Sequence, residues 1–140
     1  MEMRMDYLLK GVPASRGVAR GRVRLVHEWS RDVVLRRGEV LVVHFPAPSL
    51  SPLLSQAEAL VCAFGGSLSA LIILAQEYHI PAVIGLGDAV GQLREGDQVW
   101  VDGVTGIVST FDSRGVWQVN VNGLVRLPKL KADALLSVTA

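Results

Sequence analysis

The stretch that decides the fold is Gly65-Gly66-Ser67-Leu68-Ser69-Ala70-Leu71-Ile72-Ile73-Leu74-Ala75-Gln76-Glu77-Tyr78-His79-Ile80-Pro81-Ala82-Val83. Two glycines let the backbone turn out of an apolar run at residues 60–64, and Ser67 and Ser69 offer side-chain oxygens that suit helix capping. About ten helix-compatible residues follow before Pro81 ends them. The stretch therefore predicts a strand, a tight turn and a helix.

The first turn of this predicted helix is a candidate anion site. Backbone N–H groups at the start of a helix have no intrahelical acceptor, and the positive end of the helix dipole attracts negative charge. We therefore expect an anion-binding tip made of Gly65, Gly66, Ser67, Ser69 and Ala70.

Shorter motifs on both sides predict the rest of the fold. Glycines punctuate β-prone pieces near the N-terminus, and a continuous apolar run at residues 40–43 is typical of a strand covered on both faces. A proline-rich loop then leads to a short helix, and Asp102-Gly103 is a tight-turn signal between two later strands. These elements are expected at residues 8–26, 40–43, 53–57, 83–84, 88–93, 98–102 and 107–108.

Four motifs in this order resemble the mobile, phosphohistidine-bearing domain of phosphoenolpyruvate-utilising enzymes, the group that contains phosphoenolpyruvate synthase and pyruvate phosphate dikinase. The resemblance rests on an opening glycine-rich segment, a strand and proline-containing loop that start a short helix, the Gly-Gly helix run that ends in Ile-Pro-Ala-Val, and a closing Gly-Asp-x-Val-x-Val-Asp-Gly segment. The matching residues are Gly11, Ala14, Ser15, Gly17, Ala19, Gly21, Val23, Gly65, Gly66, Ser69, Ala75, Glu77, Ile80, Pro81, Ala82, Val83, Gly96, Asp97, Val99, Val101, Asp102, Gly103, Gly106 and Val108.

The resemblance implies an α/β fold, a single-domain swivelling β/β/α sandwich, over residues 1–110. Residues 111–140 are expected to be a C-terminal extension packed on it, with a hairpin at 116–125 followed by a tail or short helix. In the full-length enzymes such a domain swings between an ATP-binding domain and a phosphoenolpyruvate-binding barrel. Because 140 residues leave no room for either, any phosphoryl donor, phosphoenolpyruvate or ATP, would be held by partners and no cofactor by this domain itself.

The chain departs from the family pattern at four positions. Ala70 stands where the family has its phosphate-accepting His, Gln76 where it has Arg, His79 where it has Gly, and Arg16 where it often has Pro. Imidazole nitrogen can carry a phosphoryl group and a methyl group cannot. We therefore expect no catalytic residue at position 70, unless Ala70 is an engineered replacement.

Another histidine could replace the lost nucleophile. His44 ends a predicted strand on the same sheet edge as the glycine pair, whereas His79 lies more than two helical turns beyond Ala70. His27 falls in a predicted surface connection without an evident partner. His44 is thus the one substitute worth testing, although a histidine at a strand end is more often structural. Ser67 and Ser69 are expected to cap the helix rather than to be phosphorylated.

Composition limits the other possibilities. Residues 1–37 carry nine of the fourteen basic side chains against four acids, but the arginines alternate as on the wet face of a strand, so we expect no nucleic-acid partner. Apolar runs are too short for a membrane span. A single cysteine, Cys62, indicates a buried structural thiol and a cytoplasmic setting, and the three histidines lack metal-ligand spacing, so we expect no metal site.

Two functions stay open on the sequence, in different classes. The first is a stand-alone, non-catalytic binding or regulatory module that meets a protein partner, or a second copy, through the edge at Gly65–Leu71. The alternative is a phosphotransferase component that relays a phosphoryl group between partner chains. A third, an unrelated swivelling module of the kind found in hydro-lyases, is disfavoured by the order of the motifs.

Overall fold

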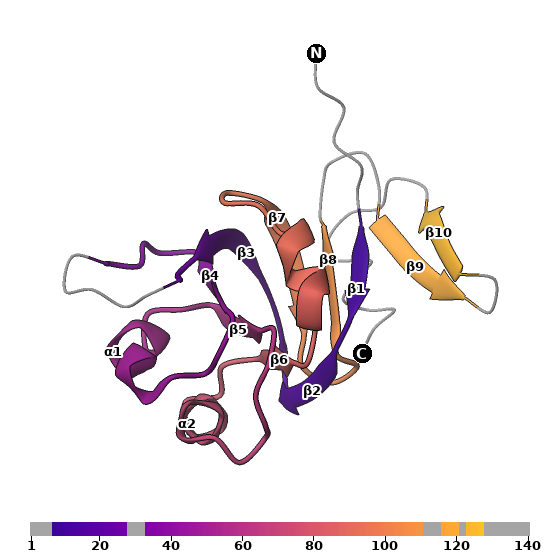
Figure 1. Cartoon of the computed structure of the whole chain (residues 1–140). Helices are drawn as coiled ribbons and strands as arrows, with labels where there is room; N and C mark the ends of the chain where they lie inside the picture. The colour runs from indigo at the N-terminus through magenta and orange to yellow at the C-terminus, as the bar shows by residue number, and fades with distance from the viewer. Residues whose placement is uncertain (1–6, 28–32, 111–115, 121–122, 128–140) are drawn as a thin grey trace.

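A computed structural model gives the structure of residues 7–27 and 33–110, with the backbone of 116–120 and 123–127. Within these ranges eight strands form one sheet and two more form a hairpin (Figure 1). The strands are β1 (Leu8–Lys10), β2 (Val12–Ser15), β3 (Val18–Leu25), β4 (Glu39–Val43), β5 (Ala59–Cys62), β6 (Ala82–Ile84), β7 (Gln98–Asp102), β8 (Ile107–Thr110), β9 (Val116–Asn120) and β10 (Gly123–Leu127). The helices are α1 (Ser51–Leu54) and α2 (Ala70–Glu77), with 3-10 turns η1 (Pro48–Leu50) and η2 (Gly87–Gln92).

The main sheet is closed by its first two strands. Its order is β1-β8-β7-β3-β4-β5-β6-β2, so β1 and β2 form opposite edges although only Gly11 separates them in the chain. β1 pairs antiparallel with β8, β2 pairs antiparallel with β6, and Gly11 N donates to Gly106 O over 2.7 Å. One bent segment therefore joins the two edges and curls the sheet into two facing halves.

Glycines allow the backbone to approach closely at this closure. A Cβ on Gly103 would overlap the carbonyl oxygen of Ser15, and a Cβ on Gly106 would overlap that of Gly11. A Cβ on Gly11 would lie 2.6 Å from the carbonyl oxygen of Ile84. Side chains at these positions would push the joined strands apart, which explains why the opening and closing segments are rich in glycine.

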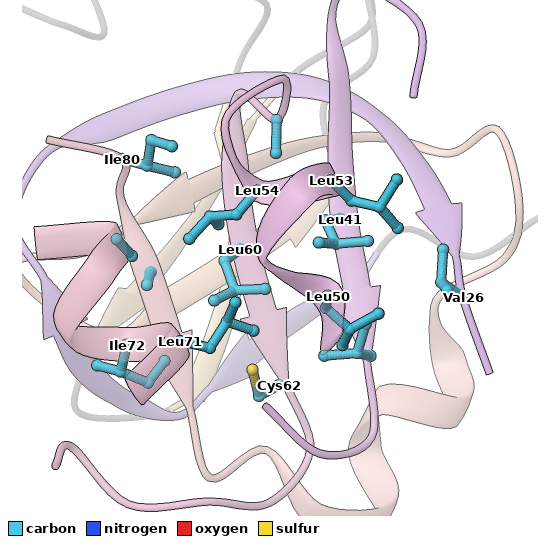
Figure 2. Packing of buried hydrophobic residues seen from close by; sticks show 14 of the residues in the cluster. Val26, Leu41, Leu50, Leu53, Leu54, Leu60, Cys62, Leu71, Ile72 and Ile80 are labelled. Atoms are coloured by element: carbon cyan, nitrogen blue, oxygen red, sulfur yellow. The ribbon is translucent and has the colours of Figure 1, made fainter. Parts of the chain in front are cut away.

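Side chains of the central strands alternate between two cores. Leu41, Val43, Leu60 and Cys62 belong to the core beneath α1 and α2, which lie on the same side of the sheet (Figures 1 and 2). Their neighbours in sequence face the interior of the curled sheet, where they join residues of β3, β7 and β8. The continuous apolar run at 40–43 is buried at every position, which confirms a strand covered on both faces. The interior set includes Val23, Val40, Val42, Ala59, Val61, Val99, Val101 and Val108.

The strands β3, β4, β5 and β6 run parallel to one another, so their carboxyl ends meet at one edge of the sheet. Each strand continues there into a different connection: His27 follows β3, His44 follows β4, and the Gly65-Gly66 turn follows β5. This edge therefore gathers the residues that the sequence singles out.

The architecture confirms the predicted α/β fold class, with a β/β/α arrangement of curled sheet and helices. One helix differs from its prediction. A helix is expected at 53–57, but α1 spans Ser51–Leu54 and directly continues η1, because Pro48 and Pro52 both suit early helical positions. Ser51 does not cap it, since its hydroxyl donates to Pro48 O over 2.6 Å within the same turn.

The predicted hairpin near the C-terminus is present in the backbone. β9 and β10 pair antiparallel, with Gly123 opposite Asn120. Its packing against residues 1–110, and the tail or short helix predicted after it, lie outside the described residues.

Candidate functional site

The turn between β5 and α2 contains Gly65, a position that only glycine can occupy. Gly65 has a φ of +122°, a conformation that L side chains rarely adopt. A Cβ there would also lie 2.6 Å from Pro46 Cδ, so the loop after β4 packs directly against the turn. Gly66 has open space around its Cα and lies exposed. The two loops together form the outer end of the molecule at this edge.

Helix α2 begins as predicted, but its cap differs. Ser69 is the N-cap residue, and the first helical hydrogen bond runs from Ile73 N to Ser69 O over 3.0 Å. The hydroxyl of Ser69 makes no capping bond, and Ser69 Oγ is buried without a hydrogen-bond partner among the described residues. The expectation of capping by this side chain is therefore wrong, because the hydroxyl is buried away from the N–H groups. The backbone N–H groups of Ala70, Leu71 and Ile72 have no acceptor within the helix, because they lie in its first turn.

Exposure divides the residues of the tip. Leu68 is 87% exposed, and Gly65, Gly66, Ser67 and Ala70 are also exposed. Leu71 is 0% exposed and points into the core beneath the helix (Figure 2). The predicted contact edge Gly65–Leu71 therefore ends at Ala70, since Leu71 is not available to a partner.

Two aromatic side chains beside the tip are not singled out by the sequence analysis. Phe45 and Phe64 stack with ring centroids 5.3 Å apart and stay 63% and 42% exposed. Phe45 follows β4 and Phe64 follows β5, and Phe64 N donates to His44 O over 2.8 Å. The signal was present: both aromatics come directly after buried runs that end at the same sheet edge. With Leu68 they form what we call the apolar tip, defined as Phe45, Phe64 and Leu68.

The predicted substitute nucleophile lies at the same edge, next to a second imidazole. His44 is exposed, as expected for a residue just beyond β4, and its ring centroid is 5.5 Å from that of His27. His27 thus has a neighbour that the sequence did not reveal, because β3 and β4 bring residues 17 positions apart side by side. No group of three or more metal-binding side chains occurs in the described ranges.

The far end of α2 holds His79, well separated from Ala70. Ile80 N donates to Ala75 O over 2.9 Å and His79 N to Gln76 O over 3.2 Å, the paired bonds of a Schellman motif. His79 therefore occupies the position after the C-cap with a φ of +57°, where glycine is usual. The structure places it outside the tip, as predicted.

Cys62 is expected to be unreactive. It is 0% exposed at the end of β5, and burial raises the pKa of its thiol from 9.0 to about 12. A thiol that stays protonated is a poor nucleophile, so Cys62 is a structural core residue, as predicted. Within the described part of the chain, none of the helices has the length and apolar character needed to cross a bilayer.

A curled sheet with helices on its outer side, and a glycine turn that projects the start of one helix from the carboxyl edge, defines the class of β/β/α sandwich domains. Within that class the chain belongs to the family of the PEP-utilising enzyme mobile domain, which matches residues 35–106. The resemblance noted in the sequence is therefore confirmed.

Relatives support this assignment over most of the chain. It is 42% identical over 106 residues to phosphoenolpyruvate synthase of Aeropyrum pernix, which covers 74% of this chain and 13% of the relative. It is 35% identical over 101 residues to rifampicin phosphotransferase of Bacillus subtilis, covering 72% of this chain and 12% of that protein. The chain thus corresponds to about an eighth of the length of these relatives.

A solved structure supports the fold alone. Aconitase X of Thermococcus kodakaraensis, in its holo-form, superposes with a TM-score of 0.55 at 19% identity, covering 76% of this chain and 99% of that chain. At this identity the likeness says nothing about chemistry, whereas the family match and the relatives point to the phosphoenolpyruvate-utilising group.

Proposed function

We propose that this domain is a non-catalytic binding or regulatory module that docks through its apolar tip. The observation that carries the proposal is the combination of Ala70 at the phosphate-accepting position with exposed Phe45, Phe64 and Leu68 in the two loops at the same sheet edge. A methyl group cannot accept a phosphoryl group, and a cluster of large apolar side chains at one projecting end is typical of a protein contact.

The partner we propose is a protein with the ATP-binding or phosphoenolpyruvate-binding part of a phosphoenolpyruvate synthase, in the same chain or in another. This chain matches only 13% of the relative from Aeropyrum pernix, so most of that protein lies outside the matched region. A second copy of this chain is the competing occupant. The N–H groups at the start of α2 would receive a carboxylate or phosphate of the partner at Gly65, Gly66, Ser67, Ser69 and Ala70.

Docking can be tested with one residue of the apolar tip. Leu68→Ser should weaken binding to the host's ATP-binding or phosphoenolpyruvate-binding protein by roughly tenfold, since full burial of a leucine contributes about 1.5 to 3 kcal/mol. Isothermal titration calorimetry measures the affinity, and analytical ultracentrifugation separates a protein partner from self-association. The matched control is Ile73→Ser in the adjoining helix α2, at a 41% exposed position outside the tip, and it should leave the affinity unchanged.

The proposal fails if the wild-type domain binds neither candidate protein, stays strictly monomeric and ignores phosphate. It also fails if Leu68→Ser and Ile73→Ser weaken binding equally, because the contact would then not be centred on the tip.

A second candidate is favoured by one observation, the histidine pair at the same edge. In this candidate His44 is the phosphoryl acceptor: a ring nitrogen attacks phosphorus, a nitrogen–phosphorus bond forms, and the bond from phosphorus to the leaving oxygen breaks, releasing enolpyruvate from phosphoenolpyruvate or ADP from ATP. The neighbouring His27 ring, 5.5 Å away, could hold the proton of the acceptor.

Intact-mass measurement separates the two candidates. The domain is incubated with phosphoenolpyruvate or ATP and cell extract, and a gain of one phosphoryl group that disappears in His44→Ala but persists in His27→Ala would establish the carrier function. No gain in the wild-type domain, together with a gain in Ala70→His, would show that the carrier site is intact except for its nucleophile and would support the docking proposal.

A further inference from the structure

The positions where this chain departs from its family pattern converge on one hollow. Arg16, Gln76 and His79 are up to 63 residues apart in sequence, yet they line the same surface hollow of about 270 Å³ together with Ala14 and Ser15. The fourth departure, Ala70, lies at the other end of α2, about 12 Å away along an eight-residue helix. Three separate substitutions therefore meet in one place.

The side chains of the hollow are suited to an anion. Arg16 and His79 are exposed, and neither makes an ion pair with another residue in the ranges that the structure describes. Ser15 is 4% exposed, and its hydroxyl makes no hydrogen bond with those residues. Carboxylates are absent from the lining. A guanidinium, an imidazole and a hydroxyl together offer several donors and no competing negative charge.

Gln76 fixes the shape of the hollow. Its Nε2 donates to Ala14 O over 2.8 Å, which ties α2 to β2 and holds the floor of the hollow in place. Because this bond occupies the amide, Gln76 positions the site, and the charge at the mouth comes from Arg16. The family arginine at position 76 is thus replaced by a neutral residue while a cation is present at position 16.

His79 is held in a costly conformation at the rim. Its φ of +57° lies in the left-handed region, where a residue with a Cβ is disfavoured and where the family pattern has glycine. Backbone strain of this kind tends to occur where a side chain is needed for binding. The imidazole is therefore placed beside the hollow at a cost in stability.

We propose that this hollow is a binding site for a small oxyanion, a phosphate or carboxylate group of a metabolite, held by Arg16, His79 and Ser15. The site does not rest on docking at the tip, because it lies at the opposite end of α2. The bound group would meet Arg16 as its main charge partner, with His79 and Ser15 as additional donors.

The test is a titration of the ¹⁵N-labelled domain followed by amide chemical shifts. Inorganic phosphate and succinate are added in separate arms at constant ionic strength, so that general screening is the same throughout. Saturable shifts of the amides of residues 14–16 and 76–79 are expected in at least one arm. Stronger binding of phosphate assigns the site to phosphorylated ligands, and stronger binding of succinate assigns it to carboxylates.

Two arginine variants decide whether the site is specific. Arg16→Gln should raise the dissociation constant roughly tenfold, as expected for the loss of one charge-assisted hydrogen bond. Arg22→Gln removes another exposed arginine outside the hollow and should leave the constant unchanged. The spectrum of each variant also shows directly whether it is folded.

Three results would overturn the proposal: no saturable shift in either arm, shifts confined to residues 65–72, or equal weakening by both variants. Shifts at 65–72 would report the start of α2 instead. Because Leu68→Ser should leave anion binding at the hollow unchanged, failure of the docking proposal and failure of this one are distinguishable.

Discussion

The closure of the sheet keeps the residues of the family pattern, whereas the two ends of α2 contain the positions where this chain departs from it. At the closure the pattern residues Ser15, Gly103 and Gly106 are kept, and they lie buried where backbones nearly touch. At the ends of α2 and on the adjoining loop the pattern is abandoned, at Arg16, Ala70, Gln76 and His79, and all four side chains are exposed. We infer that close packing restricts which residues can occur at the closure. At the exposed ends of α2 packing sets no such restriction, so only a function would preserve the family residues there.

The largest effect is expected from breaking the closure with one methyl group. Gly103→Ala should lower the free energy of unfolding by more than about 3 kcal/mol, because its Cβ would overlap Ser15 O and neither backbone can move without separating β2 from β6. Urea unfolding followed by circular dichroism measures it. Gly91→Ala is the matched control: it has open space and should be neutral or stabilising by up to about 1 kcal/mol. Similar values for the two variants would contradict the packing explanation.

A smaller loss should follow from one buried hydroxyl at the other end of β1 and β7, away from the closure. Tyr7 OH donates to Asp97 Oδ2 over 2.8 Å, and both residues are buried. Tyr7→Phe should therefore lower the free energy of unfolding by about 2 kcal/mol, since a buried carboxylate oxygen that also accepts from Arg94 N would lose the tyrosine donor. Tyr78→Phe, at a 49% exposed position, should change it by less than about 0.5 kcal/mol. Equal effects would mean that the hydroxyl is not the cause.

The buried thiol of Cys62 should make the free energy of unfolding depend on pH above pH 9. Because the pKa of Cys62 is raised from 9.0 to about 12, the unfolded chain loses this proton above pH 9 while the folded domain keeps it. The free energy of unfolding should then fall by about 1.4 kcal/mol per pH unit between pH 9 and 12 from this group alone. The wild-type slope minus that of Cys62→Ala isolates the effect from other titrating groups, and identical slopes would contradict a buried, protonated thiol.

The smallest effect should come from restoring glycine at an abandoned position. His79→Gly removes the left-handed strain after α2 but frees the unfolded chain, so a net gain of about 0.5 kcal/mol is expected. Differential scanning calorimetry measures the shift in Tm. His79→Ala keeps the Cβ and should show no gain. If glycine at this position destabilised the domain, the imidazole would be supporting the fold and not only the hollow.

Much of the fold could be predicted because its signals are local. A few consecutive residues are enough to predict three of its elements: the strand at residues 40–43, the turn at Asp102-Gly103 and the start of α2. The start of the helix at Ser69 was predicted correctly, but the capping hydrogen bond expected from the Ser69 hydroxyl is absent, since the direction of a hydroxyl depends on the packing around it.

The site was harder to predict because its parts come from distant segments. The stack of Phe45 on Phe64 and the neighbouring rings of His27 and His44 exist only because parallel strands end at one edge. The burial of Leu71 could have been read from the helical period, since it lies one turn from Ala75 on the inner face. The hollow has no local signal, as its lining comes from β2 and the end of α2.

The segment that joins both edges of the sheet has a consequence for biosynthesis. β1 and β2 are synthesised before the other described strands, yet their partners β6 and β8 are among the later ones, and Tyr7 N donates to Thr110 Oγ1 across 103 residues. The nascent chain must hold β2 unpaired until residue 84 has emerged and β1 unpaired until residue 110 has emerged, so the sheet cannot close before then. Closure is then a single late event, which favours slow, all-or-none maturation of the domain over stepwise growth from its N-terminus.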